Sequence, residues 1–121
     1  MNRIDKKFIQ LKNQDKKAFI AFITAGYPNL STTARLVITL EKNGVDIIEL
    51  GVPFSDPLAD GPTIQEASRH SLQQGTNLVK ILGLVKQLRK HTSLPICLMT
   101  YYNPVFCFGE KNFVDKAVVA L

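Results

Sequence analysis

The sequence predicts a parallel α/β fold, in which buried strands alternate with helices. Three apolar runs, at residues 18–23, 45–50 and 96–100, have the length of strands rather than helices. The segments between them carry the 3.6-residue apolar period of amphipathic helices. Parallel strands with right-handed helical crossovers form either an open doubly wound sheet or part of a (β/α)8 barrel, and periodicity alone does not choose between them.

The chain begins with a predicted amphipathic helix of about a dozen residues, because Ile4, Phe8 and Leu11 fall at i, i+4 and i+7. The apolar run at 18–23 is too short for a typical helix, and Gly26 follows it closely. We interpret this run as a buried parallel strand.

The second helix is expected between a cap at Ser31 and an end at Gly44, where glycine can adopt a left-handed conformation. Val37 and Leu40 share its apolar face. The strand at 45–50 follows after a very short connection, as is usual in βα units.

Two helices are predicted between the second and third strands. Pro62 suits the first turn of a helix that runs to about residue 73, and Asp60 is a candidate cap. Asn77 can cap the next helix, whose apolar residues follow the helical period closely. These residues are Leu78, Ile81, Leu82, Val85 and Leu88.

The third strand, at 96–100, follows the break at Leu94-Pro95 and contains Cys97, which we interpret as a small core residue. An irregular stretch is expected at 101–109, and a last helix from about Lys111. Cys97 and Cys107 are too few and too far apart for a disulfide framework or a C-x-x-C motif.

Composition excludes several classes of protein. The chain has 121 residues, 45% of them hydrophobic and 21% charged, which fits one globular domain over 1–121. No apolar run approaches the ~18 residues of a membrane span, and the charged N-terminus is unlike a signal peptide, so we expect a cytoplasmic location and no membrane partner. The net charge of +5 includes five lysines within the first 17 residues, but these lack interleaved aromatics. A solvated surface is therefore favoured over nucleic-acid binding.

The candidate chemistry lies where the strands end, because parallel α/β folds collect functional groups there. Glu49 ends the second strand and alternates onto the same face as Val45 and Ile47. An apolar setting suits a carboxylate to proton transfer near neutral pH. A solvated glutamate at a strand end is an equally open interpretation. No metal-ligand cluster or glycine-rich phosphate loop occurs, so no nucleotide cofactor is indicated.

The loop after Glu49, GVPFSDPLADGP, holds three prolines and two aspartates within 12 residues and should be stiff. From position alone, Asp56 and Asp60 are most simply explained as an Asx turn or a helix cap. Thr24 and Tyr101 end the neighbouring strands and could line the same mouth, although tyrosines there are more often packing residues.

Residues 49–65, ELGVPFSDPLADGPTIQ, resemble the signature of the tryptophan synthase α-subunit family. AFITAGYPNLS at 21–31 and LMTYYNPVFCFG at 98–109 agree with that family in order and spacing, so the resemblance covers essentially the whole chain. It implies a (β/α)8 barrel with an N-terminal helix on its floor. The chain would supply that helix and the first three βα units.

The resemblance also implies a reaction, the reversible cleavage of indole-3-glycerol phosphate into indole and glyceraldehyde 3-phosphate in tryptophan biosynthesis. Glu49 matches the family's acid–base residue, and Asp60 matches the carboxylate that stabilises charge near the indole nitrogen. Phe22 and Tyr101 match positions in or beside the indole pocket. The family's phosphate site follows strands 7 and 8, outside these residues.

The resemblance further implies an α2β2 complex, in which indole passes to a β subunit that alone carries pyridoxal phosphate. The expected contact region with that partner comprises Pro53, Asp56, Pro57 and Asn103. Since only three of eight barrel strands are present, the alternative is a truncated, noncatalytic remnant that at most docks onto the β subunit.

Overall fold

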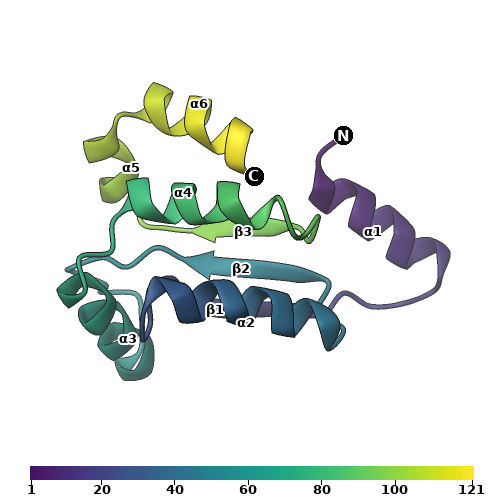
Figure 1. Ribbon diagram of the computed structural model, residues 1–121, viewed down its shortest axis with the longest axis horizontal. Coiled ribbons are helices and arrows are strands. Elements are labelled where there is room, and N and C mark those ends of the chain that lie inside the picture. Colours follow the sequence, from purple (N-terminus) through teal and green to yellow (C-terminus); the bar gives the residue numbers. More distant parts are fainter.

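The computed structural model describes residues 1–121 as a three-stranded parallel sheet with six helices (Figure 1). The strands are β1 (Ile20–Thr24), β2 (Ile47–Gly51) and β3 (Ile96–Met99). The helices are α1 (Arg3–Asn13), α2 (Leu30–Lys42), α3 (Pro62–Gln73), α4 (Leu78–Leu88), α5 (Tyr102–Phe108) and α6 (Glu110–Ala120). The predicted alternation of strands and helices is confirmed.

The strands lie in the order β1-β2-β3, and all pairs are parallel. In the register, Phe22, Glu49 and Cys97 stand side by side across the sheet. Consecutive strands joined by right-handed crossovers keep their helices on one face, whereas a doubly wound sheet requires the strand order to reverse. Three strands in this order open both a barrel and a doubly wound sheet of order 3-2-1-4-5-6, so the strand order alone leaves both architectures open.

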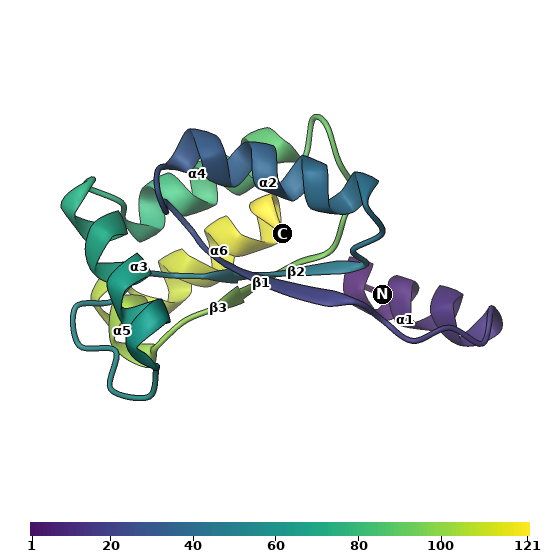
Figure 2. The same cartoon turned by 90° about the horizontal axis from the view of Figure 1, so that it is seen from below.

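The core lies between the sheet and the helices α2 and α4. Ile48 and Leu50 point to this side of β2 and are completely buried. They belong to one apolar cluster with Val37 of α2 and with Ile81 and Val85 of α4. Figure 2 shows the sheet nearly edge-on, with α2 and α4 on the same side. Each such side chain contributes about 1.5–3 kcal/mol when buried, so this layer fixes the sheet.

The opposite face of the sheet has no helix over its middle (Figure 2). Phe22 and Met99 on this face are 38% and 54% exposed. Cys97 is exposed as well, which corrects its interpretation as a core residue. The physical reason is alternation: Ile96 and Leu98 point toward the helices, and Cys97 points the other way.

Asparagine side chains cap three of the helices, α1 through Asn2, α2 and α4, and one of these caps differs from the prediction. Asn29, rather than Ser31, caps α2, because its Oδ1 accepts the Thr32 N–H at 2.8 Å. Asn77 caps α4 as predicted and accepts the Lys80 N–H at 2.9 Å. Gly44 follows α2 with φ +92°, in the left-handed region.

Two further boundaries correct the sequence predictions. The N-cap of α3 is Gly61, with no side-chain cap, so Asp60 does not cap this helix. The stretch expected to be irregular contains α5, because Pro104 falls in its first turn, where a missing N–H costs nothing. The last helix begins at Glu110, one residue before its predicted start.

Helix α1 lies beside the amino-terminal ends of the strands, while α3 and α5 lie at the carboxyl ends (Figure 1). Leu11 is the buried residue of α1, and Lys7 of the same helix forms an ion pair with Asp46 at 3.8 Å. Arg3 donates a hydrogen bond to the Leu121 carbonyl. The expected position at the barrel floor is consistent with this placement. No helix in the structure combines the length and apolar character needed to cross a bilayer.

Gly26, at φ +81°, packs closely against two buried side chains, and substitution can test this packing. A Cβ there would lie 2.2 Å from Thr76 Oγ1 and 2.3 Å from Ser71 Oγ, whereas one on Gly44 would meet nothing within 4 Å. We expect Gly44→Ala to cost about 1–2 kcal/mol of backbone strain. Gly26→Ala should cost an additional ~1–3 kcal/mol, because the buried hydroxyls must move. Urea unfolding of both variants measures the difference, and equal losses would contradict this packing.

Candidate active site

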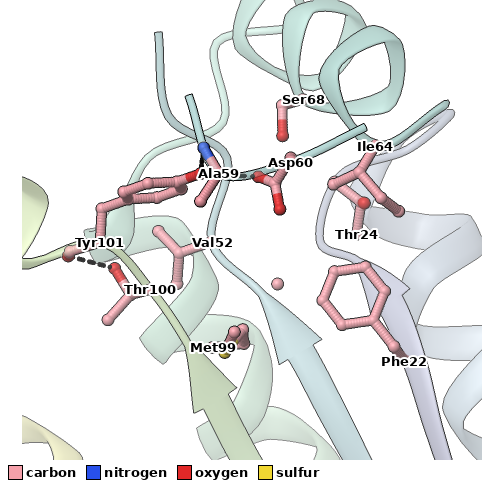
Figure 3. Close-up of a pocket in the computed structure, with 11 residues that line it drawn as sticks. Phe22, Thr24, Val52, Ala59, Asp60, Ile64, Ser68, Met99, Thr100 and Tyr101 are labelled. Carbon is pink, nitrogen blue, oxygen red and sulfur yellow. Dashed lines mark hydrogen bonds between the residues drawn. The ribbon is translucent and has the colours of Figure 1, made fainter. Parts of the chain in front are cut away.

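A cavity of about 220 Å³ lies where the carboxyl ends of the three strands meet the loop 52–60 and α3. Figure 3 shows side chains from all of these elements around it. The lining residues are Phe22, Thr24, Gly51, Val52, Ala59, Asp60, Ile64, Ser68, Met99, Thr100 and Tyr101. Most of the lining is apolar, and Asp60 is its one charged member.

Gly51 allows an aromatic ring to lie at the edge of the cavity. It stands between Thr24 of β1 and Met99 of β3 in the strand register. A Cβ on Gly51 would come within 2.6 Å of Phe22 Cζ, so the ring of Phe22 occupies the space that any other residue would fill. Strand glycines often mark such close approaches.

Asp60 reaches the cavity from the end of the loop and is held there by Tyr101. The Tyr101 hydroxyl donates to Asp60 Oδ2 at 3.2 Å and accepts the Ala59 N–H at 3.0 Å. Its ring packs against Phe54, with 5.1 Å between centroids. The other Asp60 oxygen points into the cavity (Figure 3). One carboxylate oxygen is therefore fixed and the other is available to a ligand.

Glu49 lies on the same face of β2 as Gly51, two residues earlier, which is about 7 Å along the strand. It is half-buried between Phe22 and Cys97 of the adjacent strands, and it is not among the residues that line the cavity. The ion pairs of the chain lie elsewhere. The two carboxylates therefore share one side of the sheet, with Asp60 at the mouth and Glu49 deeper.

Among the lining residues that the sequence did not single out, two come from α3. Ile64 and Ser68 lie one turn apart on α3, and the i, i+4 spacing after Pro62 is the signal that could have found them. Ser68 is only 4% exposed, and Thr24, which was expected near this mouth, is 8% exposed. Their small hydroxyls add polar groups to a mainly apolar wall.

Tyr102, unlike Tyr101, does not line the cavity and is exposed. Its hydroxyl donates to Glu110, and this hydrogen bond raises the pKa of the Tyr102 phenol. The neighbouring Asn103 is exposed on α5. The two adjacent tyrosines thus have different surroundings, which their sequence alone does not distinguish.

The residues expected to contact a partner are not equally accessible. Asp56 is exposed and accepts a hydrogen bond from Ser55 Oγ at 2.7 Å, while Pro57 is half-buried. Pro53 is buried, so it can shape the loop but offers little surface. Leu58, at the tip of the loop, is 91% exposed. No three His, Cys, Asp or Glu side chains come together as a metal site.

The amino-acid sequence matches one family model, described as tryptophan synthase alpha chain, over residues 8–120. The chain belongs to the tryptophan synthase alpha chain family. The Geotalea daltonii tryptophan synthase alpha chain is 58% identical over 120 residues, which are 99% of this chain and 46% of that protein. For the Caldanaerobacter subterraneus protein of the same name the identity is 50% over 117 residues, 97% of this chain and 45% of that protein. The chain thus spans less than half the length of these relatives.

Solved tryptophan synthase structures show the same fold. The alpha subunit from Legionella pneumophila superimposes with a TM-score of 0.96 at 42% identity, over 99% of this chain and 46% of that one. A chain of Mycobacterium tuberculosis tryptophan synthase, in an aminoacrylate-bound form, gives 0.91 at 32% identity, over 99% and 49%. The fold is therefore the opening part of the family's (β/α)8 barrel, as the resemblance implied.

The hydrogen bond between Tyr101 and the loop can be tested directly. Tyr101→Phe removes the acceptor of the Ala59 N–H but keeps the ring against Phe54. A lost hydrogen bond of about 1 kcal/mol predicts roughly fivefold faster amide exchange at Ala59. Tyr102→Phe is the control, since it loses only the exposed bond to Glu110. Equal exchange rates at Ala59 in both variants, measured by NMR, would show that this hydrogen bond does not hold the loop.

Proposed function

We propose that this chain carries the indole-binding and proton-transfer part of a tryptophan synthase α active site. The observation that carries the proposal is a mainly apolar cavity with one carboxylate oxygen free to accept a hydrogen bond. Its volume of about 220 Å³ is below the ~300–1,000 Å³ typical of drug-sized ligands. A flat bicyclic ring with a single N–H donor suits these dimensions and this polarity.

In the proposed reaction, Asp60 faces the indole nitrogen. Protonation of indole C3 in indole-3-glycerol phosphate leaves positive charge on the ring, and a carboxylate beside the nitrogen stabilises it. Tyr101 already holds Asp60 Oδ2, so the remaining oxygen needs little reorganisation to accept the N–H. Preorganisation of this kind is what makes electrostatic stabilisation effective.

Glu49 is the proposed acid–base group. The hydroxyl carbon next to the ring must lose its O–H proton as the carbon–carbon bond breaks, while C3 gains a proton. The bonding electrons return to the ring, and indole and glyceraldehyde 3-phosphate leave. Glu49 extends from β2 beside Phe22, one of the cavity residues, and forms none of the ion pairs that would hold it in one charge state.

Replacement of Glu49 tests this role. Glu49→Gln keeps the shape of the side chain and removes the titrating group, so indole release from indole-3-glycerol phosphate should fall about 10²–10⁴-fold. Glu66→Gln, on the exposed face of α3, is the matched control and should stay within about twofold of the wild-type rate. Release at the same rate from the wild type and Glu49→Gln would rule out the assignment.

We also propose that the outer side of the loop contacts a tryptophan synthase β subunit, within an α2β2 complex in the cytoplasm. Asp56, Pro57 and Asn103 are the expected contacts, and the exposed tip at Leu58 supports the surface. Pyridoxal phosphate would belong to that partner only. The second candidate function is docking without catalysis, in which the chain alters β-subunit activity but releases no indole.

A titration of the β subunit tests the contact. Asp56→Asn removes one exposed charge from the loop, and we expect about tenfold more chain to be needed for the half-maximal effect on β-subunit activity. Asp15→Asn removes the same charge at the other end of the molecule, after α1, and should match the wild type. Identical titrations for both variants would reject this surface, and indole release measured in parallel separates the two candidate functions.

A further inference from the structure

The position of Asp60 depends on more than its own side chain. Asp60 ends a tight turn, in which its N–H donates to the Pro57 carbonyl at 3.0 Å. Tyr101 restrains the side of this turn that faces β3. The side that faces α3 has a different restraint, and it comes from a residue outside the cavity lining.

That restraint is the side-chain amide of Gln65. Its Nε2 donates to the Asp60 carbonyl at 2.9 Å and makes a longer contact of 3.4 Å to the Pro57 carbonyl. An amide nitrogen carries two hydrogens, so one group can serve both acceptors. Gln65 therefore joins the first and last residues of the turn to α3.

We propose that Gln65 is a positioning residue for Asp60. The inference rests on the proposed function, in which Asp60 accepts the indole N–H. Because only Gly61 separates Asp60 from the start of α3 at Pro62, Gln65 lies on a rigid element beside the turn that it holds. Tyr101 fixes the carboxylate, and Gln65 fixes the backbone from which it extends.

The test replaces the amide without changing the length of the side chain. Gln65→Met keeps the apolar stem and removes both donors. Gln73→Met, at the exposed end of the same helix, is the matched control. Two readouts are needed, namely amide exchange of Leu58, Ala59 and Asp60 by NMR, and indole affinity from the fluorescence of added indole. The chain contains no tryptophan, so the added indole is the only indole fluorophore in the sample, and its emission changes when it binds.

We expect Gln65→Met to speed exchange in the loop about fivefold and to weaken indole binding by a similar factor, while Gln73→Met matches the wild type. In an Asp60→Ala background, Gln65→Met should have no further effect on indole affinity, because its action passes through Asp60. Unchanged loop exchange in Gln65→Met, or an equal loss of affinity with and without Asp60, would overturn the inference. If Gln65→Met exchanges faster but the wild-type chain itself binds no indole, the restraint on the loop stands and the proposed function is rejected.

Discussion

The parallel pairing of three consecutive strands is the constraint on which the rest of the structure depends. Because each crossover returns on the same side, α2 and α4 fill one face of the sheet and leave the other open. The side chains that alternate away from the helices are therefore the ones available for chemistry. Glu49 and Phe22 lie on that side because their neighbours Ile48 and Ile23 face the helices.

The cavity depends on a second constraint, the stiffness of the loop that carries Asp60. Prolines at 53 and 57 restrict the backbone before any tertiary contact forms. Tyr101 then joins the loop to β3, and Gln65 joins it to α3. A restricted loop loses less conformational entropy when these bonds form, so two hydrogen-bonding side chains are enough to hold a carboxylate at the edge of the sheet.

The sequence predicted the elements and the edge of the sheet where the site lies. Apolar period and length identified all three strands, and the strand-end rule put Glu49 and the loop at one mouth. It placed the cap of α2 at Ser31 instead of Asn29, because both residues can accept an N–H and they lie two positions apart. Cys97 was misplaced because both faces of this strand are apolar, so alternation leaves no visible pattern.

The parts of the site that the sequence missed depend on tertiary contacts. Ser68 enters the cavity only because α3 packs across the strand ends, and Gln65 reaches Asp60 only because the turn at Pro57 folds back toward that helix. Helix α5 has seven residues, too few for an apolar period to be recognised. Local spacing can place a residue on one face of a helix, but it cannot show which other element of the fold that face contacts.

The contrast between the two carboxylates fits the different work proposed for them. A group that stabilises developing charge is most effective when it is fixed before the reaction, and Asp60 is held through both its side chain and its backbone. A group that transfers a proton must exist in both charge states, so a permanent ion pair would hinder it. Glu49 has no such pair and stands on a strand, where the backbone rather than a bonded partner sets its direction. The two acids are thus supported in different ways, which agrees with the proposed roles of a fixed group and of a group that changes charge.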